Sequence, residues 1–405
     1  MKETCPSKTA NAATLTKNCA TLTEDATLTE NCATLTENCA PLTEDATLTS
    51  DSPDSPTEKL AFQSDYMEGA HPAIMQKLLE TNLLHTEGYG SDPFCTEAKK
   101  LIRAACGTPR AQIQFLTGGT QTNSTVIDCL LKKWQGVIAA ETGHVAVHEA
   151  GAVEYTGHKV IALKARNGKI SAATVENYLK DFYADANWEH MVEPGMVYIS
   201  QPTEFGTLYT KQELTELSAL CKKHKIPLYA DGARLAYALG SEKNDVSLAD
   251  LARLTDIFYI GGTKCGTLFG EAVVIPEPDL IPHFLTQIKQ HGALLAKGRL
   301  LGLQFAELFK NGGDALYFQL GKTAVALAQK IQDALKKAGF KLYFDSPTNQ
   351  VFFIIENSKL QGLGQKVRYA FMEKYDDSHT VIRFCTSWAT TQKDTESLLK
   401  IIETL

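Results

Sequence analysis

Short apolar runs and longer amphipathic stretches alternate along most of this 405-residue chain. The short runs are rich in β-branched and aromatic residues, which is typical of strands buried on both faces. The longer stretches carry apolar residues at helical spacing. Strands are therefore predicted at residues 113–116, 137–140, 159–163, 196–200, 227–230, 257–260 and 272–275. Helices are predicted at 71–84, 97–105, 173–182 and 211–225, and a further helix follows residue 123 and ends at residue 134. This alternation predicts an α/β fold with a mostly parallel sheet covered by helices on both faces.

The rhythm changes after about residue 296. Long helical patterns at 300–310 and 316–338 are followed by predicted strands at 341–344 and 350–355. We then expect a helix to about residue 375, a strand at 381–385 and a last helix at 392–405. The pattern predicts a large domain at residues 58–295 and a smaller α+β domain at 296–405.

Residues 1–57 form a repeat tail of another kind. Ala-Thr-Leu-Thr recurs from residues 13, 20, 26, 33 and 46, in units of six or seven residues. One leucine per unit buries too little surface to offset the entropy of ordering, which predicts disorder. A short coiled segment with the leucines on one face is the alternative. Nine acidic residues against three lysines give the tail a charge of −6, while the whole chain carries −7.

Charge and cysteine usage exclude several classes of protein. The remainder of the chain is nearly neutral, so nothing suggests a nucleic-acid partner, which would require a basic face. The ten cysteines show no C-x-x-C spacing, and we expect no metal. Residues 1–30 lack the apolar core of a signal peptide, and no run reaches membrane-spanning length. We therefore expect a cytoplasmic protein with free thiols and no membrane contact.

A lysine stands just beyond one of the predicted strands. The run 257–260 ends at Gly261 and Gly262, and Lys264 follows. Open α/β folds bind ligands at the carboxyl ends of their strands, and a lysine there can act as a nucleophile towards carbonyl groups. A surface lysine after a strand is the ordinary alternative, so Lys264 alone decides nothing.

Other polar residues follow further predicted strands. The Gly-rich segment 117–123 precedes a helix, where backbone N–H groups can hold a phosphate, and it matches neither the dinucleotide-binding nor the P-loop pattern. His144 can stack on a ring, Asp231 can pair with a protonated pyridine nitrogen, and Arg234 can hold a phenolate or a substrate carboxylate. A tight turn, a helix cap and a structural histidine are the alternatives for single residues. Together with a Schiff-base lysine at Lys264, the set predicts pyridoxal 5'-phosphate as cofactor.

Residues from about 60 to 405 resemble the threonine aldolase and β-eliminating lyase family of fold-type I pyridoxal-phosphate enzymes. The resemblance is carried in order by Gln63-Ser-Asp65, Gly119-Thr-Gln-Thr-Asn123, His144 five residues before Glu149-Ala-Gly, Asp231-Gly-Ala-Arg234, Lys264, and Val381-Ile-Arg383 with Thr386-Ser-Trp388. It implies the fold-type I architecture, with a large cofactor-binding domain and a smaller C-terminal domain.

The resemblance also implies a role for each matching residue. Cofactor binding falls to Gly119, Thr120, Gln121, His144, Asp231, Arg234, Thr263 and Lys264. Substrate-carboxylate binding falls to Ser64, Arg234 and Arg383. One position departs from the family: Gln201-Pro-Thr-Glu204 stands where many aldolases have E-N-T-H, so that Glu204 replaces a histidine near the substrate hydroxyl. A glutamate can act as a base if its pKa is suitable, or it can orient a water or His144.

The expected reaction is retro-aldol cleavage of L-threonine or L-allo-threonine to glycine and acetaldehyde, with Lys264, His144 and Glu204 as catalytic residues. Two alternatives remain open: β-elimination from an aromatic or sulfur amino acid, and a non-catalytic binding or assembly protein on the same fold. The family further implies a homodimer or homotetramer with shared active sites. Residues 288–299 resemble the segment that sends a basic side chain to the neighbouring subunit's phosphate, and Lys297 matches it best.

Overall fold

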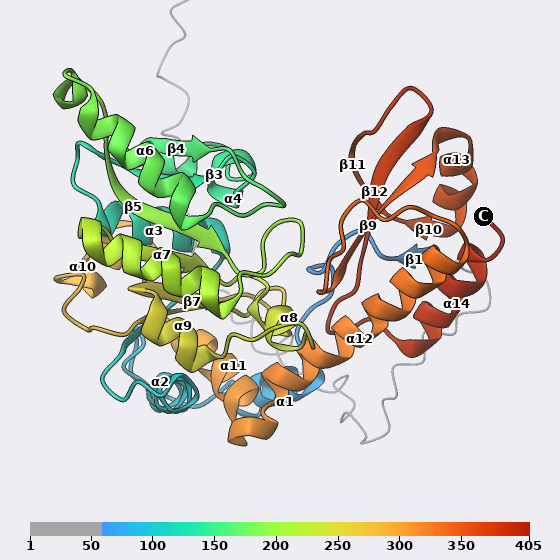
Figure 1. Cartoon of the computed structure of the whole chain (residues 1–405). Helices are drawn as coiled ribbons and strands as arrows, with labels where there is room; N and C mark the ends of the chain where they lie inside the picture. The colour runs from blue at the N-terminus through green and yellow to red at the C-terminus, as the bar shows by residue number, and fades with distance from the viewer. Residues whose placement is uncertain (1–58) are drawn as a thin grey trace, which may run out of the picture. The chain divides into compact units, whose positions relative to one another are not determined.

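The computed structural model describes residues 59–405, and the repeat tail expected at residues 1–57 lies outside them. A seven-stranded sheet with the strand order β2-β8-β7-β6-β5-β3-β4 forms the larger part (Figure 1). Its strands are β2 (Gln112–Leu116), β3 (Gln135–Ala140), β4 (Val160–Leu163), β5 (Glu193–Ser200), β6 (Leu228–Asp231), β7 (Ile257–Gly261) and β8 (Glu271–Ile275). β8 runs antiparallel to both of its neighbours, and the other neighbouring pairs are parallel. The expected mostly parallel sheet is therefore confirmed.

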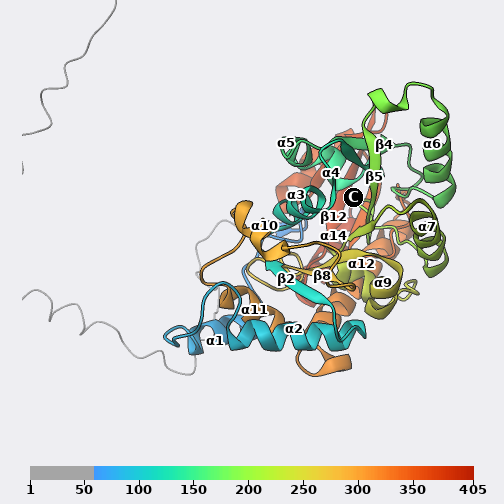
Figure 2. The same cartoon turned by 90° about the vertical axis from the view of Figure 1, so that its left-hand side faces the viewer.

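Alternate side chains of the strands feed two separate cores. Phe258 and Ile260 point into one hydrophobic cluster, and Ile257 and Tyr259 point into the other. This period of two buries both faces of the same strand. Figure 2 shows helices on both sides of the sheet. The first cluster is covered by α2 (Pro93–Cys106), α6 (Ala172–Ala184), α7 (Lys211–His224), α9 (Leu248–Leu254) and α11 (Arg299–Phe309), and the second by α3 (Gly119–Leu130), α4 (His144–Val147), α5 (Ala152–Tyr155) and α10 (Phe284–Gln290).

Local sequence explains where such a helix begins and ends, as α7 illustrates. The Thr210 side chain accepts a hydrogen bond from the backbone of Glu213, and the Glu213 side chain accepts one from the backbone of Thr210. This capping box satisfies two N–H groups that the first turn leaves unpaired. At the other end Lys225 adopts a left-handed conformation, φ 56°, which stops the helix. Two further helices of this part are α1 (Pro72–Glu80) and α8 (Leu235–Leu239).

The C-terminal part contains a second, antiparallel sheet. Its strands are β11 (Ala370–Lys374), β12 (His379–Cys385) and β9 (Gln350–Glu356), in that order. α12 (Leu316–Lys337), α13 (Asn357–Lys366) and α14 (Gln392–Ile402) share one hydrophobic cluster with it. Its core includes Phe353, Phe384 and Leu398. β1 (Leu60–Ala61) pairs in parallel with β10 (Val367–Arg368), so the first described residues lie beside this sheet (Figure 1). The smaller α+β part is present, and its boundary at residue 295 stays a prediction.

Two predicted elements of this part are wrong. The helix expected to reach residue 375 ends at Lys366, and residues 370–374 form the edge strand β11. An edge strand exposes charged side chains, which hides the strand pattern. The strand expected at 341–344 is only an isolated bridge between Leu342 and Phe353. Pro347 soon after it cannot donate to a ladder, so the pairing stops.

The topology gathers the carboxyl ends of β5, β6 and β7 at one edge of the sheet. Ser200, Asp231 and Gly261 are the last residues of these three strands, and Lys264 follows β7. Open α/β sheets bind their ligands at such an edge. Within residues 59–405, no helix is both long and apolar enough to cross a membrane.

Candidate active site

Asp231 is a buried carboxylate with four hydrogen-bond donors around it. Oδ2 accepts from the Tyr198 hydroxyl (2.7 Å) and from Asn123 Nδ2 (2.9 Å). Oδ1 accepts from the Tyr259 hydroxyl (2.5 Å) and from the backbone N–H of Ala233 (2.9 Å). Burial by itself raises the pKa of Asp231, but the charge of His144 and these hydrogen bonds lower it below its usual value. The site therefore holds a fixed negative charge at the end of β6.

His144 begins α4 and is tied to the same carboxylate through two residues. Its Nδ1 lies 2.9 Å from Glu149 Oε1, and Glu149 Oε1 also accepts from Asn123 Nδ2 (2.8 Å). Burial lowers the pKa of His144, but the bond to Glu149 and the charge of Asp231 outweigh it and raise the pKa. Asn123 thus bridges Glu149 and Asp231, and the imidazole is held in one orientation.

Glu204 lies beyond the end of β5 and closes this group of hydrogen-bonded residues. Its Oε1 accepts from the Ser200 hydroxyl (2.6 Å) and from the backbone N–H of His144 (3.0 Å). Burial raises the pKa of Glu204, and the Ser200 hydrogen bond opposes that rise without cancelling it. The raised pKa lies closer to neutral pH than that of an ordinary glutamate, which suits a residue that accepts and returns a proton.

A small cavity of about 90 Å³ brings together most of the residues predicted for the reaction. Its lining includes Lys264, His144, Glu204, Asp231, Arg234, Gly119 and Thr120. The backbone carbonyl of Lys264 accepts from the Tyr237 hydroxyl (2.5 Å), and its Nζ lies 5.5 Å from the centroid of the Tyr66 ring. Thr263 Oγ1 accepts from the backbone N–H of Gly270 (3.0 Å), which holds the turn that carries the lysine.

The N-terminus of α3 opens into this cavity without a side-chain cap. Gly118 occupies the N-cap position, and Gly119 and Thr120 line the cavity. A Cβ atom at Gly119 would lie 3.2 Å from the Tyr259 hydroxyl oxygen, so the close approach favours glycine. Gln121 does not line the cavity, and its Oε1 accepts from the Thr117 hydroxyl (2.6 Å). Uncapped N–H groups at a helix N-terminus are suited to binding a phosphate.

Arg234 is already engaged by a residue for which the sequence predicted no role. Its Nε donates to Asp65 Oδ2 (2.6 Å) and its Nη2 to Asp65 Oδ1 (2.9 Å), which is a bidentate ion pair. Burial would raise the pKa of Asp65, but the Arg234 charge and hydrogen bond lower it to about 2. The pair leaves only part of the guanidinium for a ligand.

Ser64 and Arg383 carry polar atoms that lack partners. The Ser64 hydroxyl and Arg383 Nε are buried and have no hydrogen-bond partner among the described residues. Arg383 is otherwise oriented by Gln350 Oε1 (2.7 Å from Nη1) and the Gln63 carbonyl (3.2 Å from Nη2). A buried donor without a partner costs free energy, which an anionic ligand would recover. None of Ser64, Arg383 and Lys297 lines the cavity, and Lys297 is exposed.

Sequence reasoning missed Tyr198, Tyr259 and Ser200. All three lie in strands that are otherwise apolar, so the sequence alone gave no reason to assign a role to their hydroxyl groups. The strand period could have indicated Tyr198 and Ser200, because both lie on one face of β5. Asp65 belongs to the Gln63-Ser-Asp65 motif, but its partner Arg234 is 169 residues away.

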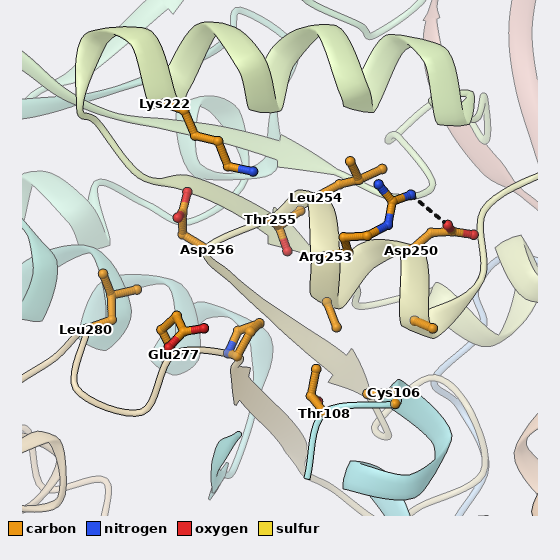
Figure 3. A pocket seen from close by; sticks show the side chains of 14 residues that line it. Cys106, Thr108, Lys222, Asp250, Arg253, Leu254, Thr255, Asp256, Glu277 and Leu280 are labelled. Atoms are coloured by element: carbon orange, nitrogen blue, oxygen red, sulfur yellow. Dashed lines mark hydrogen bonds and ion pairs between the residues drawn. The ribbon is translucent and has the colours of Figure 1, made fainter. Parts of the chain in front are cut away.

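A larger cavity, of about 730 Å³, lies at the opposite end of the strands (Figure 3). Asp256 lines it and directly precedes β7, whereas Lys264 follows that strand. Arg253 Nη2 donates to Asp250 Oδ1 (3.0 Å), and Asp256 Oδ2 accepts from the backbone N–H of Leu228 (2.8 Å). These charged groups have partners within the chain, and none of the predicted site residues lines this cavity. Residues 59–405 contain no cluster of side chains arranged to hold a metal ion.

Comparison with known proteins gives consistent matches over most of the chain. Residues 61–358 match the model of the beta-eliminating lyase family. A low specificity L-threonine aldolase from Pseudomonas aeruginosa is 30% identical over 308 residues, which are 75% of this chain and 86% of that protein. A second low specificity L-threonine aldolase, from a Pseudomonas species, is 28% identical over 312 residues, 75% of this chain and 87% of that protein.

Solved structures extend the comparison to the fold. The structure of a threonine aldolase from Leishmania major matches with a TM-score of 0.82 and 43% identity, over 85% of this chain and 98% of that one. An aspartate aminotransferase from Thermus thermophilus matches with a TM-score of 0.62 and 15% identity, over 86% of this chain and 91% of that one. The second match is a likeness of fold alone. The expected fold class, fold type I with a smaller C-terminal part, is confirmed.

Proposed function

This chain belongs to the beta-eliminating lyase family, and we propose that it is a lyase that uses pyridoxal 5'-phosphate to cleave L-threonine and L-allo-threonine into glycine and acetaldehyde. The observation that carries the proposal is the buried, ionised Asp231 in the cavity that Lys264 also lines. A fixed anion in the same cavity as a lysine suits a cationic aromatic cofactor that is attached through an amine.

The residues around this cavity fit the cofactor. Asp231 would hold the ring nitrogen in its protonated form, the uncapped start of α3 at Gly119 and Thr120 would take the phosphate, and His144 would pack on the ring. Lys264 would attach the cofactor, and Thr263 fixes the turn before it. Gln121 holds Thr117 and shapes the phosphate loop. When bound, the cofactor accepts electrons from a bond at Cα of the amino acid.

The substrate carboxylate would be held by Ser64 and Arg383. Their buried polar atoms without partners support this assignment. Arg234 would contribute the N–H groups that its ion pair with Asp65 does not use, and this ion pair holds the guanidinium in place. Holding the carboxylate fixes which bond at Cα breaks, because the arrangement of the substrate decides which bond can pass its electrons on.

Glu204 would take the proton of the substrate β-hydroxyl as the Cα–Cβ bond breaks. It lines the cavity beside His144, and its raised pKa supports a role in proton transfer. His144 would be the second proton carrier, oriented by Glu149. Return of a proton to Cα completes glycine.

The family description supports a second candidate, β-elimination from an aromatic or sulfur amino acid. This reaction needs a base for the Cα proton, which Lys264 could supply, and it releases pyruvate and ammonia. Incubation of the purified protein with L-threonine, L-allo-threonine, L-serine and L-tryptophan distinguishes the two candidates. Glycine and an aldehyde support the aldolase, and pyruvate with ammonia supports the eliminase.

We further propose a cytoplasmic homodimer or homotetramer with shared active sites. Apolar side chains on α1 and beyond it support the proposal, because Met75, Leu79 and Leu83 are exposed, the last by 87%. Exposed Lys297 would then reach the phosphate of the neighbouring subunit. Light scattering during dilution, together with activity, tests this point: a fully active monomer would contradict shared sites.

A further inference from the structure

Glu204 has to remain ionised in surroundings that favour its neutral form. It is partly buried, and Asp231 places a second negative charge in the same cavity. The cationic groups that line the same cavity are His144 from α4, Lys264 after β7 and Arg234 after β6. The charge of Glu204 also acts on Tyr198 and Tyr209. A base must hold no proton before it can accept one, so something must offset burial and the charge of Asp231.

Two donors act on one oxygen of Glu204. The Ser200 hydroxyl and the backbone N–H of His144 both donate to Oε1. No other residue of the described part donates a hydrogen bond to Oε2, and the backbone N–H of Glu204 itself also interacts with the carboxyl group. A carboxyl group whose first oxygen accepts two hydrogen bonds is fixed in its plane, and its proton enters and leaves at the second oxygen.

The Ser200 hydroxyl donates its hydrogen bond to Glu204. Ser200 has a single hydroxyl hydrogen and two oxygen atoms within reach, Glu204 Oε1 at 2.6 Å and the Tyr198 hydroxyl oxygen at 3.3 Å. The shorter contact is to the carboxylate, and charge-assisted hydrogen bonds are the stronger kind. Tyr198 donates its own proton to Asp231 (2.7 Å), so it offers none to Ser200.

We propose that Ser200 is a positioning residue, whose hydroxyl keeps Glu204 ionised and oriented so that Oε2 exchanges protons with the substrate. This inference rests on the proposed function and deepens it. In the proton transfer the hydroxyl of the amino acid loses its proton to Oε2, and the hydrogen bonds at Oε1 persist throughout. Ser200 thus allows a partly buried glutamate to act as a base near a second carboxylate.

Three variants test this role in the holoenzyme. Ser200→Ala removes the donor, Ser200→Thr keeps a hydroxyl group, and Ser218→Ala deletes a buried hydroxyl on α7 as the matched control. The pKa of Glu204 is followed by 13C NMR of the labelled glutamate carboxyl groups, with Glu204→Gln used to assign the resonance. The pH dependence of kcat/KM for L-threonine is measured in parallel.

In the wild type the Ser200 hydrogen bond stabilises the ionised form of Glu204. We therefore expect Ser200→Ala, which removes this bond, to raise the pKa of Glu204 by about one pH unit. The acidic limb of kcat/KM should move up by the same amount, with about a tenfold loss of activity on that limb. Ser200→Thr should restore both values, and Ser218→Ala should change neither.

An unchanged NMR titration in Ser200→Ala would overturn the inference. A shifted titration with an unmoved kinetic limb would also overturn it, because Ser200 would then act on Glu204 without acting on catalysis. If the protein cleaves no β-hydroxy amino acid at all, the proposed function fails. The NMR titration then still decides whether Ser200 sets the proton affinity of Glu204.

Discussion

The hydroxyl group of Tyr259 donates to Oδ1 of Asp231 over 2.5 Å, from the strand that lies next to the one Asp231 ends. Tyr259 and Tyr198 approach the carboxylate from the two neighbouring strands, and both hydroxyl groups are buried with it. Two such donors stabilise the ionised form in a site where burial alone would favour the neutral acid. The strands of the sheet therefore fix the charge that the proposed cofactor would meet.

Tyr259→Phe should weaken cofactor binding about tenfold, or ~1.4 kcal/mol, because Asp231 loses one of its charge-assisted hydrogen bonds. The ring and its packing stay. Equilibrium release of the cofactor, followed by absorbance, measures the effect. Tyr317→Phe is the matched control, since the buried hydroxyl of Tyr317 has no hydrogen-bond partner in the described part of the chain. Equal affinity of the two variants would contradict the role of Tyr259.

Asp65→Asn should destabilise the fold by about 3 kcal/mol, because it leaves the largely buried guanidinium of Arg234 without its anion. Urea unfolding at neutral pH gives the difference. The control is Asp345→Asn, which removes one partner of the exposed pair with Lys243 and should cost less than about 0.5 kcal/mol. Similar losses in both variants would mean that the Arg234 pair adds nothing.

The same ion pair has a pH dependence with a defined sign. The pKa of Asp65 is lowered from 3.8 to about 2, the Arg234 interactions outweighing burial. Its contribution is therefore present above pH 3.8 and is lost as the pH falls towards 2. When the pH falls from 3.8 towards 2, the wild type should therefore lose more free energy of unfolding than Asp65→Asn does. Thermal unfolding of both proteins over this pH range measures the difference.

Glu271 should behave in the opposite way. Burial raises its pKa from 4.5 to about 7, against the lowering effect of the Lys264 charge. Its contribution is fully present below pH 4.5 and is lost as the pH rises through 7, by about 3 kcal/mol in all. Glu271→Gln still accepts the hydrogen bond that Gly262 N–H donates to Oε2 over 3.1 Å. The free energy of unfolding of this variant should rise relative to that of the wild type between pH 5 and pH 8. If the difference between the two proteins is the same at both pH values, the raised pKa of Glu271 is contradicted.

Arg383→Lys should reduce kcat/KM by more than about tenfold, because a lysine keeps the charge but loses the planar fork that matches a carboxylate. Steady-state kinetics with L-threonine measure the loss. Arg368→Lys, on an exposed position of β10, is the control for the same chemical change. Activity of Arg383→Lys within about twofold of this control would remove Arg383 from the carboxylate site.

Strand ends could be predicted from the sequence, and the contacts between distant segments could not. Lys264, Asp231 and Glu204 each follow an apolar run, and a parallel sheet brings such ends to one edge. The partners of these residues depend on register and side-chain direction. The bridge from Asn123 to Asp231 joins residues 108 positions apart, and no local pattern encodes it. The edge strand β11 was missed because none of its five residues is buried, so apolar and polar side chains do not alternate along it.

The most direct test of the central claim is the fate of uniformly 13C-labelled L-threonine. The holoenzyme should convert it into labelled glycine and labelled acetaldehyde in equal amounts, as followed by NMR, because the Cα–Cβ bond breaks. Lys264→Ala should form neither product while its circular dichroism spectrum remains that of the wild type. A four-carbon keto acid with ammonia, or no product from the wild-type protein, would contradict the proposed aldol cleavage.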